Sequence, residues 1–111
     1  MDKLAQYRQI VEEMLLEYGK RKLSHGDIEV QTIFDPKRDH YQIVHVGWDR
    51  DNWVHSCIIH IDIKGDKIWL QWNGTEDDIG ADLVAAGVSK SDIVLGFESP
   101  FMRQFTEYAV G

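Results

Sequence analysis

The sequence predicts an α+β fold, in which an N-terminal amphipathic helix packs on an antiparallel β-sheet made of a four-stranded meander and a short C-terminal strand. Residues 53–72 contain two alternating runs of β-branched and aromatic side chains, and the Gly65-Asp66 pair between them is typical of a hairpin turn. Residues 3–18 instead place apolar side chains three and four positions apart, which indicates a helix with one buried face. Short turns between successive strands favour antiparallel neighbours.

Length and charge narrow the function classes. At 111 residues the chain has the usual size of one domain, so residues 1–111 are expected to fold as a unit. Its 19 acidic and 12 basic residues give a formal charge of −7. Nucleic acids are held by clustered Lys and Arg, so this balance disfavours nucleic-acid binding by the whole surface.

The sequence also indicates the cellular compartment. The single Cys57 excludes an intrachain disulfide and fits a reducing cytoplasm. No apolar stretch is long enough for a membrane span, and the N-terminus does not resemble a secretory signal.

The first half of the chain predicts one helix and two strands. The helix is expected to start after Asp2, a good N-cap, and to end near Gly19. Residues 28–35 and 40–48 alternate and predict strands, joined by a turn in which Pro36 presets the backbone. Gly47 indicates a bulge or a close approach of another backbone segment. In so small a domain, the apolar stripe of this helix is expected to lie on the sheet and close the core. The stripe consists of Leu4, Tyr7, Ile10, Val11, Met14, Leu15 and Tyr18.

The region after the hairpin predicts a second helix around residues 76–86, with Thr75 as its N-cap and Gly87 as its left-handed end. Its expected inward side chains are Ile79, Leu83 and Val84. Residues 93–97 predict a buried strand or the base of a pocket, and a short helix is expected to start at Ser99-Pro100.

His60 and Asp62 are the main candidates for a chemical site. Strict alternation places them on one face of their strand, with His55 and Cys57 on the other. Two ligands at i and i+2 make only half of a zinc or iron site. A third ligand would have to come from the neighbouring strand, which offers His45 or His40, and the sequence does not fix the register. No metal or other cofactor is therefore predicted.

Other catalytic patterns are weak. Ser56 is expected on the face of His60, but residues four apart on a strand are separated by about 13 Å, which disfavours a hydrolase. The chain lacks the GxSxG, GxGxxG and GxxxxGK[ST] motifs of hydrolases and nucleotide-binding proteins.

The four Trp residues favour an interaction surface, since they lie on or beside predicted strands: Trp48, Trp53, Trp69 and Trp72. Sheets that display aromatic residues bind RNA in some proteins, but those sheets also carry Lys and Arg, whereas Asp62, Asp66 and Glu76 lie near this hairpin. Alternation puts Trp69 on the face opposite Ile68, Leu70 and Trp72, so one of the two Trp residues is expected to be exposed. Exposed Trp is enriched at binding hot spots, which favours partner binding or self-association.

Several short motifs follow one another in a distinctive order: Asp39-His40-Tyr41-Gln42, Gly47-Trp48, His60-Ile61-Asp62-Ile63, Lys67-Ile68-Trp69, Gly74-Thr75-Glu76, Gly87-Val88 and residues 92–97. Together with the ending at Arg103 and residues 106–110, they resemble the cyanobacterial XisI family, the controlling factors of fdxN element excision. The resemblance extends from Tyr7 to the C-terminus. The chain has Ser89 and Glu98 where the family pattern has Pro and His.

The resemblance implies a cytoplasmic accessory protein of programmed DNA rearrangement in heterocysts, the nitrogen-fixing cells of cyanobacteria. It implies a non-enzymatic role beside a second small protein, XisH, and supplies no catalytic residues. Three functions stay open: binding of an XisH-like partner, together with homo-oligomer formation; direct nucleic-acid binding; and a small enzyme or ligand-binding domain that uses His60 and Asp62. The candidate contact residues are Trp48, His60, Asp62, Trp69 and Trp72.

Overall fold

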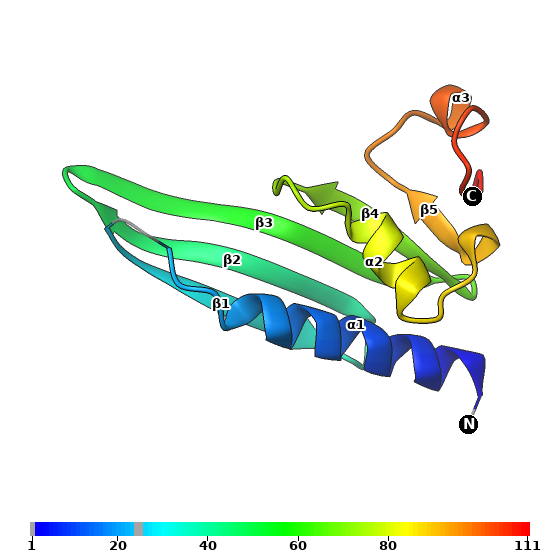
Figure 1. Ribbon diagram of the computed structural model, residues 1–111, viewed down its shortest axis with the longest axis horizontal. Coiled ribbons are helices and arrows are strands. Elements are labelled where there is room, and N and C mark those ends of the chain that lie inside the picture. Colours follow the sequence, from blue (N-terminus) through cyan, green and yellow to red (C-terminus); the bar gives the residue numbers. More distant parts are fainter. Residues whose placement is uncertain (1, 24–25) are drawn as a thin grey trace.

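The computed structural model describes residues 2–23 and 26–111. In chain order its elements are α1 (Lys3–Gly19), β1 (Asp27–Asp35), β2 (His40–Asp49), β3 (Asn52–Lys64), β4 (Lys67–Asn73), α2 (Ile79–Ala85), the 3₁₀ helix η1 (Lys90–Asp92), β5 (Ile93–Leu95) and α3 (Pro100–Arg103). The strands form one five-stranded sheet in the order β1-β2-β3-β4-β5 (Figure 1). The first four strands are antiparallel and β5 runs parallel to β4. The predicted α+β class, with its meander and added C-terminal strand, is confirmed.

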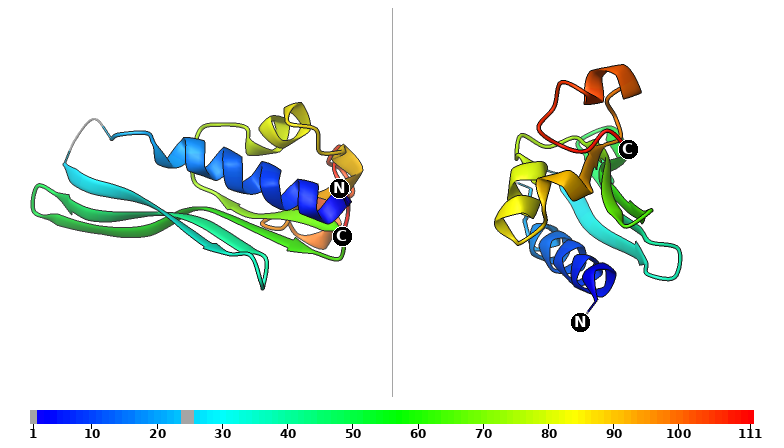
Figure 2. Two further views of the ribbon diagram at one scale, coloured as in Figure 1. Left: turned by 90° about the horizontal axis from the view of Figure 1, so that it is seen from below. Right: turned by 90° about the vertical axis from the view of Figure 1, so that its right-hand side faces the viewer.

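The molecule has two layers. Helices α1 and α2 lie over the same face of the sheet, as the side views show (Figure 2). Tyr7, Val11 and Leu15 of α1 are buried against the strands, so the predicted role of the amphipathic stripe is confirmed. The core also contains side chains from β2, β3, β4, α2, the segment after α2, and β5: Tyr41, Ile43, Ile59, Ile61, Ile63, Ile68, Leu70, Ile79, Leu83, Val88 and Ile93. No helix of the described segments is both long and apolar enough to cross a membrane.

The helix ends follow their capping groups. Asp2 caps α1 as predicted, because its Oδ1 accepts a hydrogen bond of 2.7 Å from the Ala5 backbone N–H. The predicted start of α2 is wrong by three residues. Asp78 caps this helix by accepting from the Ala81 N–H at 3.0 Å, whereas the Thr75 hydroxyl donates to Asn73 Oδ1 at 2.6 Å and shapes the preceding turn.

The C-terminal elements agree with their predictions. Gly87 follows α2 with φ of 114°, which is the left-handed end expected of a glycine. β5 is a buried strand, and Ser99 caps α3 by accepting from the Met102 N–H at 3.2 Å. The chain then returns beside β5 through a bridge between Val94 and Ala109, so the C-terminal segment lies at this edge of the sheet.

The two residues of the turn determine the β-hairpin between β3 and β4. Gly65 and Asp66 both have positive φ, of 57° and 64°, and form the predicted two-residue turn. Gly47 marks a close backbone approach, as expected, because a Cβ atom there would lie 2.1 Å from the Asp27 carbonyl oxygen of β1.

Two β-bulges overturn the prediction of strict alternation. On β3, Ile59 pairs with Ile43 and Cys57 pairs with Val44, which leaves Ile58 as an extra residue. Residues directly opposite each other share a face of the sheet. His55 and Cys57 therefore lie on the same face as His60 and Asp62, and Ser56 lies on the opposite face.

The second bulge is on β4. Leu70 pairs with Ile61 and Trp72 pairs with His60, so Gln71 is the extra residue. Trp72 therefore leaves the face of Ile68 and Leu70, where alternation placed it, and joins Trp69 on the opposite face.

Candidate functional site

The outer face of the sheet, defined here as the face opposite α1 and α2, collects most of the candidate residues. Residues that pair across neighbouring strands form rows on this face, and the strand register gives the members of each row. One row contains His40, Asp62 and Trp69, and the next contains Gln42, His60 and Trp72. Near the far end of the same face, Trp48 lies opposite Trp53. All five candidate residues thus share one surface: Trp48, His60, Asp62, Trp69 and Trp72.

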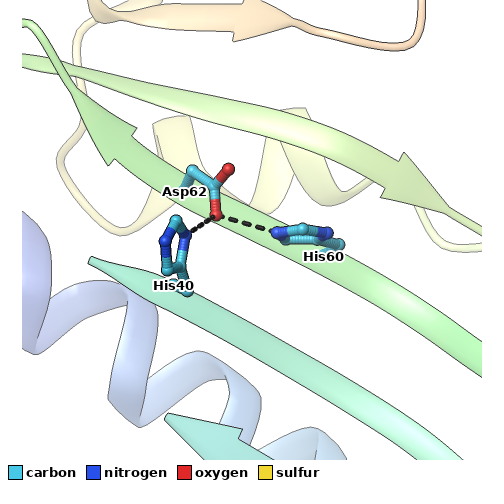
Figure 3. Close-up of side chains that lie close together, drawn as sticks. All are labelled: His40, His60 and Asp62. Carbon is cyan, nitrogen blue, oxygen red and sulfur yellow. Dashed lines mark hydrogen bonds and ion pairs between the residues drawn. The ribbon is translucent and has the colours of Figure 1, made fainter. Parts of the chain in front are cut away.

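Asp62 lies between two histidines (Figure 3). Its Oδ1 atom is 2.8 Å from His40 Nδ1 and 2.8 Å from His60 Nε2. The strand register explains this geometry, because His40 lies directly opposite Asp62 and His60 precedes Asp62 by two residues on the same face. The structure therefore unites His60 and Asp62, and it selects His40 as the third member of the cluster.

The cluster has a further member that the sequence did not indicate. Gln71 donates from Nε2 to Asp62 Oδ2 at 3.1 Å, and it lies two residues after Trp69, which is paired with Asp62. Burial alone would raise the pKa of Asp62, but hydrogen bonds from His40, Gln71 and His60 outweigh it and hold the pKa below its ordinary value. Asp62 is therefore an ionised acceptor at neutral pH.

His45, the alternative third ligand, is not part of the cluster. It lies opposite Ser56 and so occupies the helix-facing side of the sheet. Its Nε2 atom is buried and has no hydrogen-bond partner among the described residues. Desolvation lowers the pKa of His45, which keeps the ring neutral.

Three Trp side chains are exposed on the outer face: Trp48, Trp53 and Trp72. Trp48 and Trp53 contact each other edge to face with ring centroids 5.2 Å apart. Trp53 was not among the predicted contact residues, although a Trp next to each end of the Asp49–Asn52 turn is a pattern that predicts cross-strand pairing.

Trp69 is partly covered rather than exposed. Lys64 Nζ lies 4.1 Å from its ring centroid and the Arg103 guanidinium lies 5.1 Å from it. Both are cation–π contacts, and Arg103 comes from the C-terminal segment. The exposed Trp of β4 is therefore Trp72, contrary to the face assignment made from alternation.

A cavity of about 540 Å³ lies on the helix-facing side of the sheet. Met14, Tyr18, Ile59 and Ile79 form its apolar lining, and the Arg21–Asp77 ion pair, with N···O of 2.7 Å, lies at this cavity. Because Ile59 and His60 point to opposite faces of β3, this cavity is separate from the His40–His60–Asp62 cluster.

The fold defines a class of protein: a small α+β domain whose mixed sheet is covered by helices on one face and presents polar and aromatic side chains on the other. Comparison with known proteins identifies the family. The model of the XisI family, described as XisI protein, matches residues 1–110. The chain belongs to the XisI family.

Solved structures agree with this membership. The crystal structure of a XisI-like protein from Anabaena variabilis ATCC 29413 is similar with a TM-score of 0.91 and 44% identity, over 97% of this chain and 99% of that chain. The fdxN element excision controlling factor XisI from the same organism is similar with a TM-score of 0.85 and 32% identity, over 99% of this chain and 100% of that chain. A search of curated proteins found no match.

Proposed function

We propose that this chain is a non-enzymatic controlling factor of DNA element excision and that it acts by binding a protein partner. The observation that carries the proposal is its similarity, along both whole chains, to a protein described as the fdxN element excision controlling factor XisI. Identity of 32% over the full length supports a shared role as well as a shared fold.

The outer face supports protein binding as the means of control. Trp48, Trp53 and Trp72 expose large apolar surfaces on the outer face. Helices α1 and α2 cover the other face of the sheet (Figure 2). Trp is the residue type most often found at the energetic centre of protein interfaces. A second protein that covers this face would bury all three rings.

Charge supports a protein partner over DNA. The chain carries a formal charge of −7, and the β1 positions in the outer-face rows include Asp27, Glu29 and Asp35. Such a surface repels phosphate and attracts a basic partner. An XisH-like protein in the cytoplasm is the partner that we propose.

The test is co-purification with the XisH-like protein from the same genome. We expect a complex with the wild-type chain and weaker binding, by about tenfold or more, for Trp72→Ala and for the double variant Trp48→Ala/Trp53→Ala. Leu16→Ala is the matched control, because Leu16 is an exposed apolar residue of α1, away from the outer face. No complex at micromolar concentration, or equal losses in the control, would overturn the proposal.

Direct nucleic-acid binding is the second candidate, and the specific observation in its favour is the pair of cations at Trp69. Lys64 and Arg103 flank this ring, and aromatic side chains beside cations can stack on unpaired bases. Binding of this kind weakens steeply with salt because counterions are released. A gel-shift titration at low salt that shows no complex with DNA or RNA would exclude it.

A further inference from the structure

The cluster of His40, His60 and Asp62 combines three side chains of the types that bind transition metals. Among residues 2–23 and 26–111, it is the only group of three or more His, Cys, Asp or Glu side chains whose ligand atoms all lie within 4.8 Å of one another. The sequence predicted no metal because it left His60 and Asp62 without a third ligand. The register of β2 against β3 supplies that ligand as His40.

We propose that His40, His60 and Asp62 form a binding site for a divalent transition metal of the zinc class. The ligand atoms would be His40 Nδ1, His60 Nε2 and Asp62 Oδ1. Three protein ligands and one position open to water are the arrangement found in many zinc sites that contain two imidazoles and one carboxylate.

The geometry is close to what coordination needs. Both ring nitrogens are directed at the same carboxylate oxygen, each at 2.8 Å (Figure 3). In a tetrahedral zinc site with bonds of 2.0–2.1 Å, neighbouring ligand atoms are roughly 3.3 Å apart. A metal ion would therefore require each ring nitrogen to lie about half an ångström farther from Asp62 Oδ1, a shift that needs no change of strand register.

Contacts that would hold the ligand side chains in place are also present. Gln71 donates to Asp62 Oδ2 and leaves Oδ1 for the ion, so it orients the carboxylate from behind. His60 and Asp62 sit on one continuous strand, and His40 is held opposite by the β2–β3 pairing. These contacts fix the ligands before an ion arrives, which lowers the entropic cost of binding.

Access is open from the solvent side. The side chain of His40 is 53% exposed, whereas that of Asp62 is 13% exposed, so the cluster is closed by the sheet beneath it and open above. An incoming hydrated ion can therefore exchange waters for ligands without rearrangement of the core. The same opening leaves room for a bound water, or for a donor group of a partner on the outer face.

Coordination would replace the two hydrogen bonds to Asp62 Oδ1 with three bonds from the metal to the protein. The ring nitrogens that face Asp62 must each present a lone pair, so any proton they carry moves to the other ring nitrogen or to solvent. The mixed imidazole and carboxylate set suits zinc, cobalt and nickel, while magnesium and calcium prefer sites made only of oxygen. The proposal concerns the isolated chain and does not depend on its role in excision.

The test is metal binding by untagged, metal-free protein. We expect one equivalent of Zn²⁺ in calorimetry and, with Co²⁺, the visible absorption bands of a four-coordinate site. A large excess of Mg²⁺ or Ca²⁺ should leave Zn²⁺ binding unchanged. His40→Gln and His60→Gln should each weaken binding by at least tenfold, and Gln71→Ala should weaken it by about tenfold.

The variants separate a metal site from a hydrogen-bonded cluster. A Gln side chain still donates an N–H to Asp62 but is a poor ligand for zinc, so the His→Gln variants should stay folded and lose the metal. His55→Ala is the matched control, since His55 is an exposed histidine on the same face of β3. Loss of binding in the two Gln variants with retention in the control supports the site. No binding by the wild-type chain, undiminished binding by His40→Gln, or an equal loss in His55→Ala overturns it.

Discussion

His40 lies directly opposite Asp62 across β2 and β3, and its Nδ1 atom is 2.8 Å from Asp62 Oδ1. The residue before it, Asp39, joins the same end of the sheet to α1. The Asp39 carbonyl accepts from the Ile63 N–H at 3.1 Å, and its carboxylate accepts from Arg8 Nε at 2.8 Å. The start of β2 is thus held by β3 on one side and by α1 on the other, which positions the His40 ring over the outer face.

The His40–Asp62 contact should be measurable as a coupling energy. We expect a double-mutant cycle of His40→Ala and Asp62→Ala, followed by urea unfolding in EDTA, to give roughly 0.5–1 kcal/mol. The value lies below the usual range of about 1.5–3 kcal/mol for a hydrogen bond to a charged group, because His40 is half exposed. Additive effects of the two substitutions would show that the contact does not form in solution.

Much of the fold follows from local chemistry. The Gly65-Asp66 turn, the Asp2 cap and the apolar stripe of α1 each depend on a few neighbouring residues, so the sequence specifies them directly. The predicted cap at Thr75 failed because two acceptors compete for the start of α2. Asp78, three residues later, takes that role while Thr75 bonds to Asn73.

The candidate site depends on bulges, which the pattern of side chains does not reveal. If the pairing of β2 and β3 continued from Asp49 and Asn52 without a bulge, His40 would lie opposite Ile61. Because Ile58 is an extra residue in β3, His40 lies opposite Asp62 instead. The bulge at Gln71 likewise turns Trp72 to the outer face. The position of a bulge depends on how the side chains and backbone hydrogen bonds of two paired strands fit together. The sequence of one strand alone therefore does not predict it.

Two adjacent leucines of α1 offer a test of the helix–sheet interface. Leu15 is fully buried, whereas Leu16 is 49% exposed. Leu15→Ala removes core contacts and leaves a cavity, so we expect it to lower the free energy of unfolding by about 2–5 kcal/mol. Leu16→Ala should change it by less than about 1 kcal/mol. Urea denaturation compares them, and similar losses would contradict the placement of α1.

Gly47 should tolerate substitution less well than Gly65. Both have positive φ, but an added Cβ at Gly47 would meet the Asp27 carbonyl oxygen at 2.1 Å, while at Gly65 it would meet no atom within 4 Å. We expect Gly65→Ala to cost roughly 1–2 kcal/mol from backbone strain alone. Gly47→Ala should cost about 2–4 kcal/mol, since it adds a clash between β1 and β2. Equal costs in chemical unfolding would show that β1 does not approach so closely.

Acid should weaken the link between α1 and the start of β2. The hydrogen bond from Arg8 lowers the pKa of Asp39. A carboxyl whose pKa is lower in the folded chain stabilises it fully above the unfolded value of about 3.9, and this contribution disappears as the pH falls through the folded pKa. Asp39→Asn should therefore reduce stability at pH 7 and differ less from wild type below about pH 4.

Arg8→Gln serves as the second variant in that experiment, because it removes the main cause of the lowered pKa while leaving the Asp39 carboxyl in place. Thermal unfolding across the pH range should show the same convergence with wild type in acid. A stability difference for Asp39→Asn that stayed constant with pH would contradict the ion pair.

Arg103 should be irreplaceable by Lys in holding the C-terminal segment against the sheet. Its Nε atom donates to the carbonyls of Leu95 and Glu98, its Nη2 atom to the Gly96 carbonyl, and its guanidinium lies over Trp69. Lysine cannot reproduce this planar set of donors. We expect Arg103→Lys to speed hydrogen exchange in residues 96–111, with a local loss of roughly 1–3 kcal/mol, and to shift Trp emission to longer wavelength as Trp69 becomes hydrated.

The control for Arg103→Lys is Lys90→Ala, which also removes a contact with the C-terminal segment. Lys90 Nζ is 3.2 Å from Glu107 Oε2, but both side chains are well exposed, so this ion pair should contribute less than about 1 kcal/mol. Its loss should leave exchange in residues 96–111 close to wild type. If Arg103→Lys exchanged as slowly as Lys90→Ala, the segment would have to be held by the Val94–Ala109 bridge and its apolar contacts, and the guanidinium would be dispensable.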